Sequence, residues 1–74
     1  MKVTRKEIQH STLALIGDIE TEANFNFDKD TWFNVQLPRK LERYKNSGST
    51  VSGDAKHITF YSKNYQVTYS WENE

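Results

Sequence analysis

The sequence of 74 residues contains no cysteine, so neither a disulfide nor a thiolate ligand for zinc can stabilise the fold. Its longest apolar run, residues 13–16, is much shorter than the roughly 20 residues of a membrane-spanning helix. No apolar stretch of the length found in export signals follows the N-terminal residues. We therefore expect a cytoplasmic protein that does not enter a membrane.

Residue patterns that carry catalysis or bind metals are also missing. His10 and His57 are the only histidines, and neither has a second ligand at the spacing of a metal site. The glycines are too far apart for a phosphate-binding loop, and Asp28 and Asp30 begin a calcium-loop pattern that does not continue. We therefore expect no catalytic residues, no metal and no cofactor, and a protein that is not an enzyme.

The formal net charge is zero, but the two signs are separated along the chain. Residues 17–36 contain five acidic side chains and one lysine, a net charge of −4. Residues 37–63 contain six basic and two acidic side chains, a net charge of +4. Two interpretations stay open: the opposite charges meet across the fold, or they form an acidic and a basic patch that each select a partner.

Aromatic residues, by contrast, are plentiful at 14% of the chain, which indicates a folded protein. The N-terminal residues predict a helix over 5–16, because Thr4 and Glu7 have capping-box spacing and Val3 and Ile8 have the spacing of a hydrophobic staple. Gly17 is well placed to end this helix. A rival interpretation reads the alternation from residue 13 onward as part of one long first strand.

Two β-hairpins are predicted after this helix. In the first, strands 18–27 and 31–37 join through a turn at 28–30, which places apolar residues on one face and Trp32 on the polar face. In the second, strands 56–62 and 65–71 pair Phe60 with Val67 and Ile58 with Tyr69. Between the hairpins, Pro38 suits the first position of a short helix, and residues 46–54 are predicted to form a flexible loop.

The predicted fold class is α+β in a single small domain, residues 1–74. An N-terminal helix packs on an antiparallel four-stranded sheet made of the two hairpins. The alternative is a mostly-β meander or small barrel with one long first strand. The expected core contains one face of the helix and the inward face of each strand: Ile8, Leu15, Ile16, Ile19, Ala23, Phe25, Phe33, Val35, Leu37, Ile58, Phe60, Val67 and Tyr69.

The predicted function is a small non-enzymatic interaction module that binds a protein partner, compatible with an accessory or regulatory protein of bacterial or phage type. Aromatic and arginine side chains dominate protein-binding surfaces. The partner-binding candidates are accordingly two aromatic residues and the basic segment 39–45: Trp32, Tyr61, Arg39, Lys40, Arg43 and Lys45. The alternative is a nucleic-acid-binding module in which exposed aromatics stack on bases and the basic residues of 39–63 meet phosphates. A homodimer is a further alternative.

Overall fold

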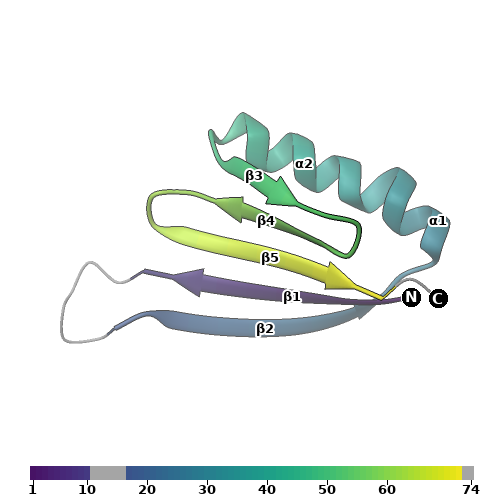
Figure 1. The fold of residues 1–74 in the computed structure, drawn as a ribbon, viewed down its shortest axis with the longest axis horizontal. Coiled ribbons are helices and arrows are strands. Elements are labelled where there is room, and N and C mark those ends of the chain that lie inside the picture. Colours follow the sequence, from purple (N-terminus) through teal and green to yellow (C-terminus); the bar gives the residue numbers. More distant parts are fainter. Residues whose placement is uncertain (11–16, 73–74) are drawn as a thin grey trace.

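The computed structural model describes residues 1–10 and 17–72 and shows an α+β fold, as predicted (Figure 1). Five antiparallel strands form one sheet in the order β2-β1-β5-β4-β3, rather than the four strands expected. They are β1 (Lys2–Gln9), β2 (Ile19–Asn26), β3 (Thr50–Gly53), β4 (His57–Tyr61) and β5 (Tyr65–Trp71). A helical segment connects the two outermost strands, β2 and β3. The first and last strands, β1 and β5, lie side by side, with β5 in the middle of the sheet.

The prediction of an N-terminal helix over 5–16 is wrong for the described part of that range. β1 pairs with β2 on one side and β5 on the other, so its backbone groups find partners in two ladders. Thr4 and Glu7, which have capping-box spacing, lie on opposite faces of this strand: the Thr4 hydroxyl donates to Asn24 Oδ1 at 2.9 Å, and Glu7 pairs with Arg5. A cap contributes only about 1 kcal/mol, and pairing on both sides outweighs it. Residues 11–16 lie outside the described residues, and the start of the rival long strand, from residue 13, lies there as well.

The first predicted hairpin is half right. The strand predicted over 18–27 is present as β2, but its partner is β1, with Val3 opposite Phe25 and Arg5 opposite Ala23. Residues 31–37 are helical instead of extended. The Asp28 side chain accepts a hydrogen bond from Thr31 N at 3.4 Å and caps the helical segment. From there, every fourth side chain turns toward the sheet, at the helical spacing of Trp32, Gln36, Lys40 and Tyr44.

The helical segment runs continuously through α1 (Lys29–Thr31), a π-helical turn η1 (Trp32–Gln36) and α2 (Leu37–Asn46). The helix predicted around Pro38 is therefore present, although it begins earlier and Pro38 is the second residue of α2 rather than the first. Proline has no N–H to donate within a helix. The wider turn of η1, in which Leu37 N donates to Trp32 O, directly precedes this proline.

The second predicted hairpin is confirmed. β4 and β5 pair Ile58 with Tyr69 and Phe60 with Val67, in the register that the sequence predicts. Trp71 N donates to Lys56 O at 2.9 Å beyond the end of β4. The segment 46–54, predicted as a loop, contains β3, which pairs with β4 from Thr50 opposite Tyr61 to Gly53 opposite Ile58.

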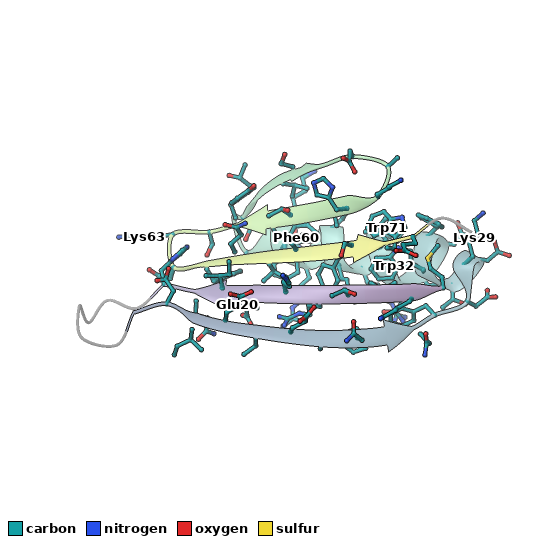
Figure 2. The ribbon with its side chains drawn as sticks, turned by 60° about the horizontal axis from the view of Figure 1, so that its bottom comes forward. Glu20, Lys29, Trp32, Phe60, Lys63 and Trp71 are labelled. Atoms are coloured by element: carbon teal, nitrogen blue, oxygen red, sulfur yellow. The ribbon has the colours of Figure 1, made fainter. Side chains whose placement is uncertain are left out.

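The core lies between α2 and the strands β3 to β5 and is mostly aromatic (Figure 2). Trp32 is fully buried, with its ring centroid 5.4 Å from that of Phe27, 5.9 Å from Tyr69 and 5.5 Å from Trp71. Tyr44 stacks on Phe60 at 4.3 Å. The helix side of β2 is not part of this core, because Ile19 and Phe25, both expected inside, remain 50% and 41% exposed.

Candidate functional site

The six candidate contact residues do not form one surface. Trp32 has no exposed surface, so it contacts no partner in this conformation. Tyr61 is 41% exposed, on the face of the sheet that points away from α2, which we call the open face. Arg39, Lys40, Arg43 and Lys45 lie on α2, on the other side of the sheet.

Three basic residues of α2 come together, and β1 adds a fourth cation to them. The cationic surface, as we define it, contains Arg39, Lys40 and Arg43 of α2 and Arg5 of β1, whereas Lys45 lies on another side of the helix. Burial, followed by the positive charges of Arg43, Arg5 and Arg39, lowers the pKa of Lys40 below its ordinary value. In the described part of the chain, none of the four α2 cations forms an ion pair with a carboxylate.

Aromatic rings of the core hold two of these cations in place. The Lys40 ammonium lies 5.9 Å from the ring centroid of Trp32 and 5.3 Å from that of Tyr69, and its Nζ donates to Gln36 Oε1 at 3.4 Å. The Arg43 guanidinium lies 5.9 Å from the ring centroid of Tyr44. A cation over an aromatic face is attracted by the electron density of the ring. Trp32 therefore supports the cationic surface from beneath.

Arg5 is the residue of this surface that the sequence analysis missed. Its Nε donates to the Tyr69 hydroxyl at 3.2 Å, and its Nη1 lies 3.3 Å from Glu7 Oε2. Arg5 points to the helix side because it lies two positions after the buried Val3, and residues two positions apart in a strand share a face. That alternation is the signal that would have found it, and the expectation of a helix over 5–16 concealed it.

An apolar hollow lies beside Lys45, on another side of α2. It has a volume of about 780 Å³ and is lined by residues of α2, β3 and the connection between them: Leu41, Glu42, Lys45, Asn46, Ser49 and Val51. Leu41 is 36% exposed and Val51 is 39% exposed. This hollow therefore places two apolar side chains next to the Lys45 cation.

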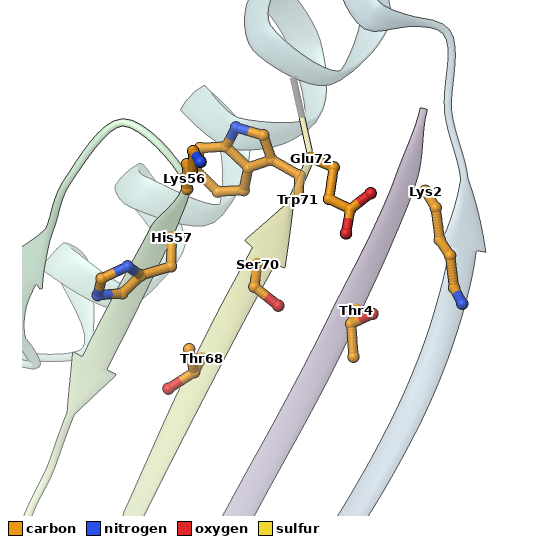
Figure 3. A pocket seen from close by; sticks show the side chains of 8 residues that line it. All are labelled: Lys2, Thr4, Lys56, His57, Thr68, Ser70, Trp71 and Glu72. Atoms are coloured by element: carbon orange, nitrogen blue, oxygen red, sulfur yellow. The ribbon is translucent and has the colours of Figure 1, made fainter. Parts of the chain in front are cut away.

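A second hollow, of about 540 Å³, lies on the open face near the ends of β1 and β5 (Figure 3). Its lining is polar: Lys2, Thr4, Lys56, His57, Thr68, Ser70, Trp71 and Glu72. Figure 3 shows the hydroxyls of Thr4, Thr68 and Ser70 spread along two strands rather than aimed at one point. His57 Nδ1 is already engaged by Asp54 Oδ1 at 2.9 Å. The arrangement does not assemble a nucleophile with a base.

The described residues contain neither a membrane-spanning helix nor a metal-binding cluster. No helix within them is both long and apolar enough to span a bilayer. No group of three or more histidine or acidic side chains within residues 1–10 and 17–72 is placed to hold a metal ion.

Comparison with known proteins finds no matching protein-family model, no matching curated protein and no matching solved structure.

Proposed function

We propose that this chain is a small non-enzymatic interaction module that binds a protein partner through α2. The observation that carries the proposal is the apolar hollow of Leu41 and Val51 beside Lys45, on a helix whose four cations have no carboxylate partner within the described residues. Protein interfaces combine an apolar centre with charged groups at the rim. The partner that fits is an acidic segment with one large apolar side chain.

The charge arrangement favours binding of an acidic partner, because clustered like charges lower the stability of the protein alone. Like charges that gather on a surface repel one another, and the lowered pKa of Lys40 records this repulsion together with burial. An acidic partner would supply the missing counter-charges and relieve the repulsion. Of the contacts expected from the sequence, this proposal keeps the four cations of α2, replaces Trp32 by Leu41 and Val51, and leaves Tyr61 outside.

The test is selection of binders from a displayed library of random peptides, followed by fluorescence polarisation with each selected peptide. We expect peptides that combine Asp or Glu with a large apolar residue. Leu41→Ser and Arg43→Glu should each weaken binding at least about tenfold, as truncation of central contacts does. Lys63→Glu, an exposed cation in the β4–β5 turn, is the matched control and should bind as the unaltered chain does.

Peptides without acidic residues, or binding that survives both Leu41→Ser and Arg43→Glu, would contradict the proposal. Circular dichroism of each variant shows whether the fold is retained, so that a loss of binding is not confused with unfolding.

A second candidate, nucleic-acid binding, is favoured by the same unpaired cations of α2. Phosphate contacts weaken steeply with salt. A labelled oligonucleotide should then bind at about 50 mM salt and lose most of its affinity at about 200 mM, and Arg39→Ala should weaken binding on every sequence. Retention of oligonucleotide binding in Arg43→Glu would rule out this surface. Glu42, which lies among the cations of α2, favours the protein partner over phosphates.

A further inference from the structure

The outer edge of β2 presents backbone groups that the sheet does not use. Met1 and Phe27 exchange two backbone hydrogen bonds, at 2.9 and 3.0 Å, so the odd-numbered residues of β2 direct their N–H and C=O groups toward β1. His10 N donates to Asn64 O. Because hydrogen-bonded pairs occur at every second residue of an antiparallel ladder, the even-numbered residues of β1 bond to β5. The outward-facing backbone groups of β2 therefore belong to Glu20, Glu22, Asn24 and Asn26.

This edge lacks the features that usually block pairing with another chain. β2 is eight residues long, contains no proline, glycine or lysine, and follows β1 without a bulge. α2 packs on the other half of the sheet, and Ile19 and Phe25 on the helix side of β2 remain about half exposed. Among the described residues, nothing pairs with the outer side of β2.

We propose that two copies of this chain pair antiparallel through their β2 strands, around a two-fold axis at Ala23, and so join their sheets into one. This surface is separate from the cationic surface of α2, and the proposal does not depend on the function proposed above.

The side chains of β2 select this register. A two-fold axis perpendicular to the sheet brings like faces together, so even-numbered residues face even-numbered residues of the second copy. An axis at Glu22 would set two carboxylates directly opposite each other, which is destabilising. An axis at Ala23 sets Glu22 opposite Asn24 and Glu20 opposite Asn26. Each carboxylate then faces an amide that can donate to it, and all four outward-facing residues of each copy lie in hydrogen-bonded pairs.

The other face of the strand agrees with the same register. On the helix side, Ile19 lies opposite Phe27 of the second copy, and Thr21 lies opposite Phe25. Both exposed apolar side chains thereby gain a neighbour across the interface. On the open face, Lys6 lies opposite Glu22 in the β1–β2 ladder and 3.9 Å from Glu20 Oε1, so a cation balances the acidic row in each copy.

The first test is a disulfide, for which the absence of native cysteine gives a clean background. Across the axis, the two Ala23 residues form a pair that is not hydrogen-bonded, with Cα atoms about 4.5 Å apart, within the range that a disulfide spans. Ala23→Cys should therefore oxidise in air to a covalent dimer. Thr21→Cys on the same face of β2 and Ser52→Cys on β3 are the matched controls and should stay largely monomeric.

The second test is sedimentation equilibrium without a cross-link. The unaltered chain should show a reversible monomer–dimer equilibrium at concentrations up to about 500 µM. Glu22→Pro removes an outward-facing N–H without touching the β1 ladder, and it should weaken the dimer at least about tenfold because both copies lose a bond. Asn24→Glu, which sets two carboxylates face to face, should also weaken it, whereas Asn34→Glu, an exposed position on η1, should not.

Three results would overturn the proposal. A chain that stays monomeric throughout this range, or Ala23→Cys that cross-links no faster than Thr21→Cys, would exclude the pairing. A dimer that survives both Glu22→Pro and Asn24→Glu would place the interface elsewhere. Because Asn24→Glu changes an exposed side chain and keeps a side-chain oxygen that can accept from Thr4, it keeps the test valid if the proline variant fails to fold. Peptide binding through α2 should be the same in Glu22→Pro as in the unaltered chain, so the two proposals fail separately.

Discussion

The two halves of the sheet are built differently. The half formed by β3, β4 and β5 lies under α2 and contributes three buried aromatic rings, whereas the half formed by β1 and β2 contributes, among the described residues, one buried hydrophobic side chain, Val3. The difference reaches the outermost strands: β3 has four residues and lies next to α2, while β2 has eight and is free along its outer side within the described chain. Stability is therefore concentrated in one half, and the surface left for pairing in the other.

The largest effect should come from removing the central side chain of the covered half. Trp32→Ala opens a cavity among three aromatic rings and should cost about 3–5 kcal/mol in free energy of unfolding. Phe25→Ala, in the uncovered half, should cost about 1 kcal/mol or less. Urea denaturation of both variants measures the contrast. Equal losses would show that the two halves contribute alike.

Arg5 joins the two halves, since it lies on β1 and donates to the Tyr69 hydroxyl on β5. Arg5→Met keeps the aliphatic part of the side chain but leaves the buried hydroxyl without this donor. We expect a loss of about 1–2 kcal/mol in free energy of unfolding, from the same denaturation experiment. Arg39→Met, an exposed residue of α2, is the control, and a loss of the same size there would refute the role given to Arg5.

Asp54 stabilises the turn between β3 and β4 and should make the covered half sensitive to acid. Hydrogen bonds from the backbone N–H of Lys56 at 2.8 Å and of His57 at 3.1 Å lower the pKa of this carboxyl. A lowered folded-state pKa contributes stability above the unfolded pKa of about 3.9, and that stability is lost as pH falls through the folded value. Asp54→Ala should therefore lower the Tm at pH 7 and approach the unaltered chain at about pH 2.5. A constant difference in Tm at both pH values would contradict this account.

The smallest effect concerns the boundary between the halves, where Lys40 lies among three arginines. Lys40→Met retains contact with the rings of Trp32 and Tyr69 and removes one of the mutually repelling charges. The gain in free energy of unfolding should be at most about 0.5 kcal/mol, while affinity for an acidic peptide falls. A destabilised variant would indicate that the attraction between Lys40 and the rings exceeds the repulsion from the arginines.

The parts of the fold that the sequence predicts correctly are those in which local pattern and tertiary environment agree. β4 and β5 alternate apolar and polar residues across a tight turn, and their register follows from that pattern alone. β2 alternates in the same way, although the pattern says nothing about its partner. Pro38 marks a helical region, although the continuous helical segment begins nine residues earlier, at Lys29.

The errors arise where two periods fit the same residues. Phe33, Val35 and Leu37 alternate as in a strand. Trp32, Lys40 and Tyr44 instead have the spacing of residues that share one face of a helix, and this helical face is the one that packs on the core. Beyond Val3, β1 has a single apolar residue, Ile8, on the opposite face, so nothing local shows that it is an inner strand. The basic residues of the candidate site could be found from composition, whereas Arg5 required knowledge of the sheet.

The position of β5 has a consequence for how the chain folds. Among the strands of residues 1–10 and 17–72, it is the last in chain order, yet it lies between β1 and β4 and alone connects the two halves. Its contacts reach far back along the chain, as between Arg5 and Tyr69, which are 64 positions apart. Ladders that close over such separations form slowly. On a ribosome, the earlier hairpin and the helix emerge before the strand that unites them, so the sheet is completed from its middle only when β5 arrives.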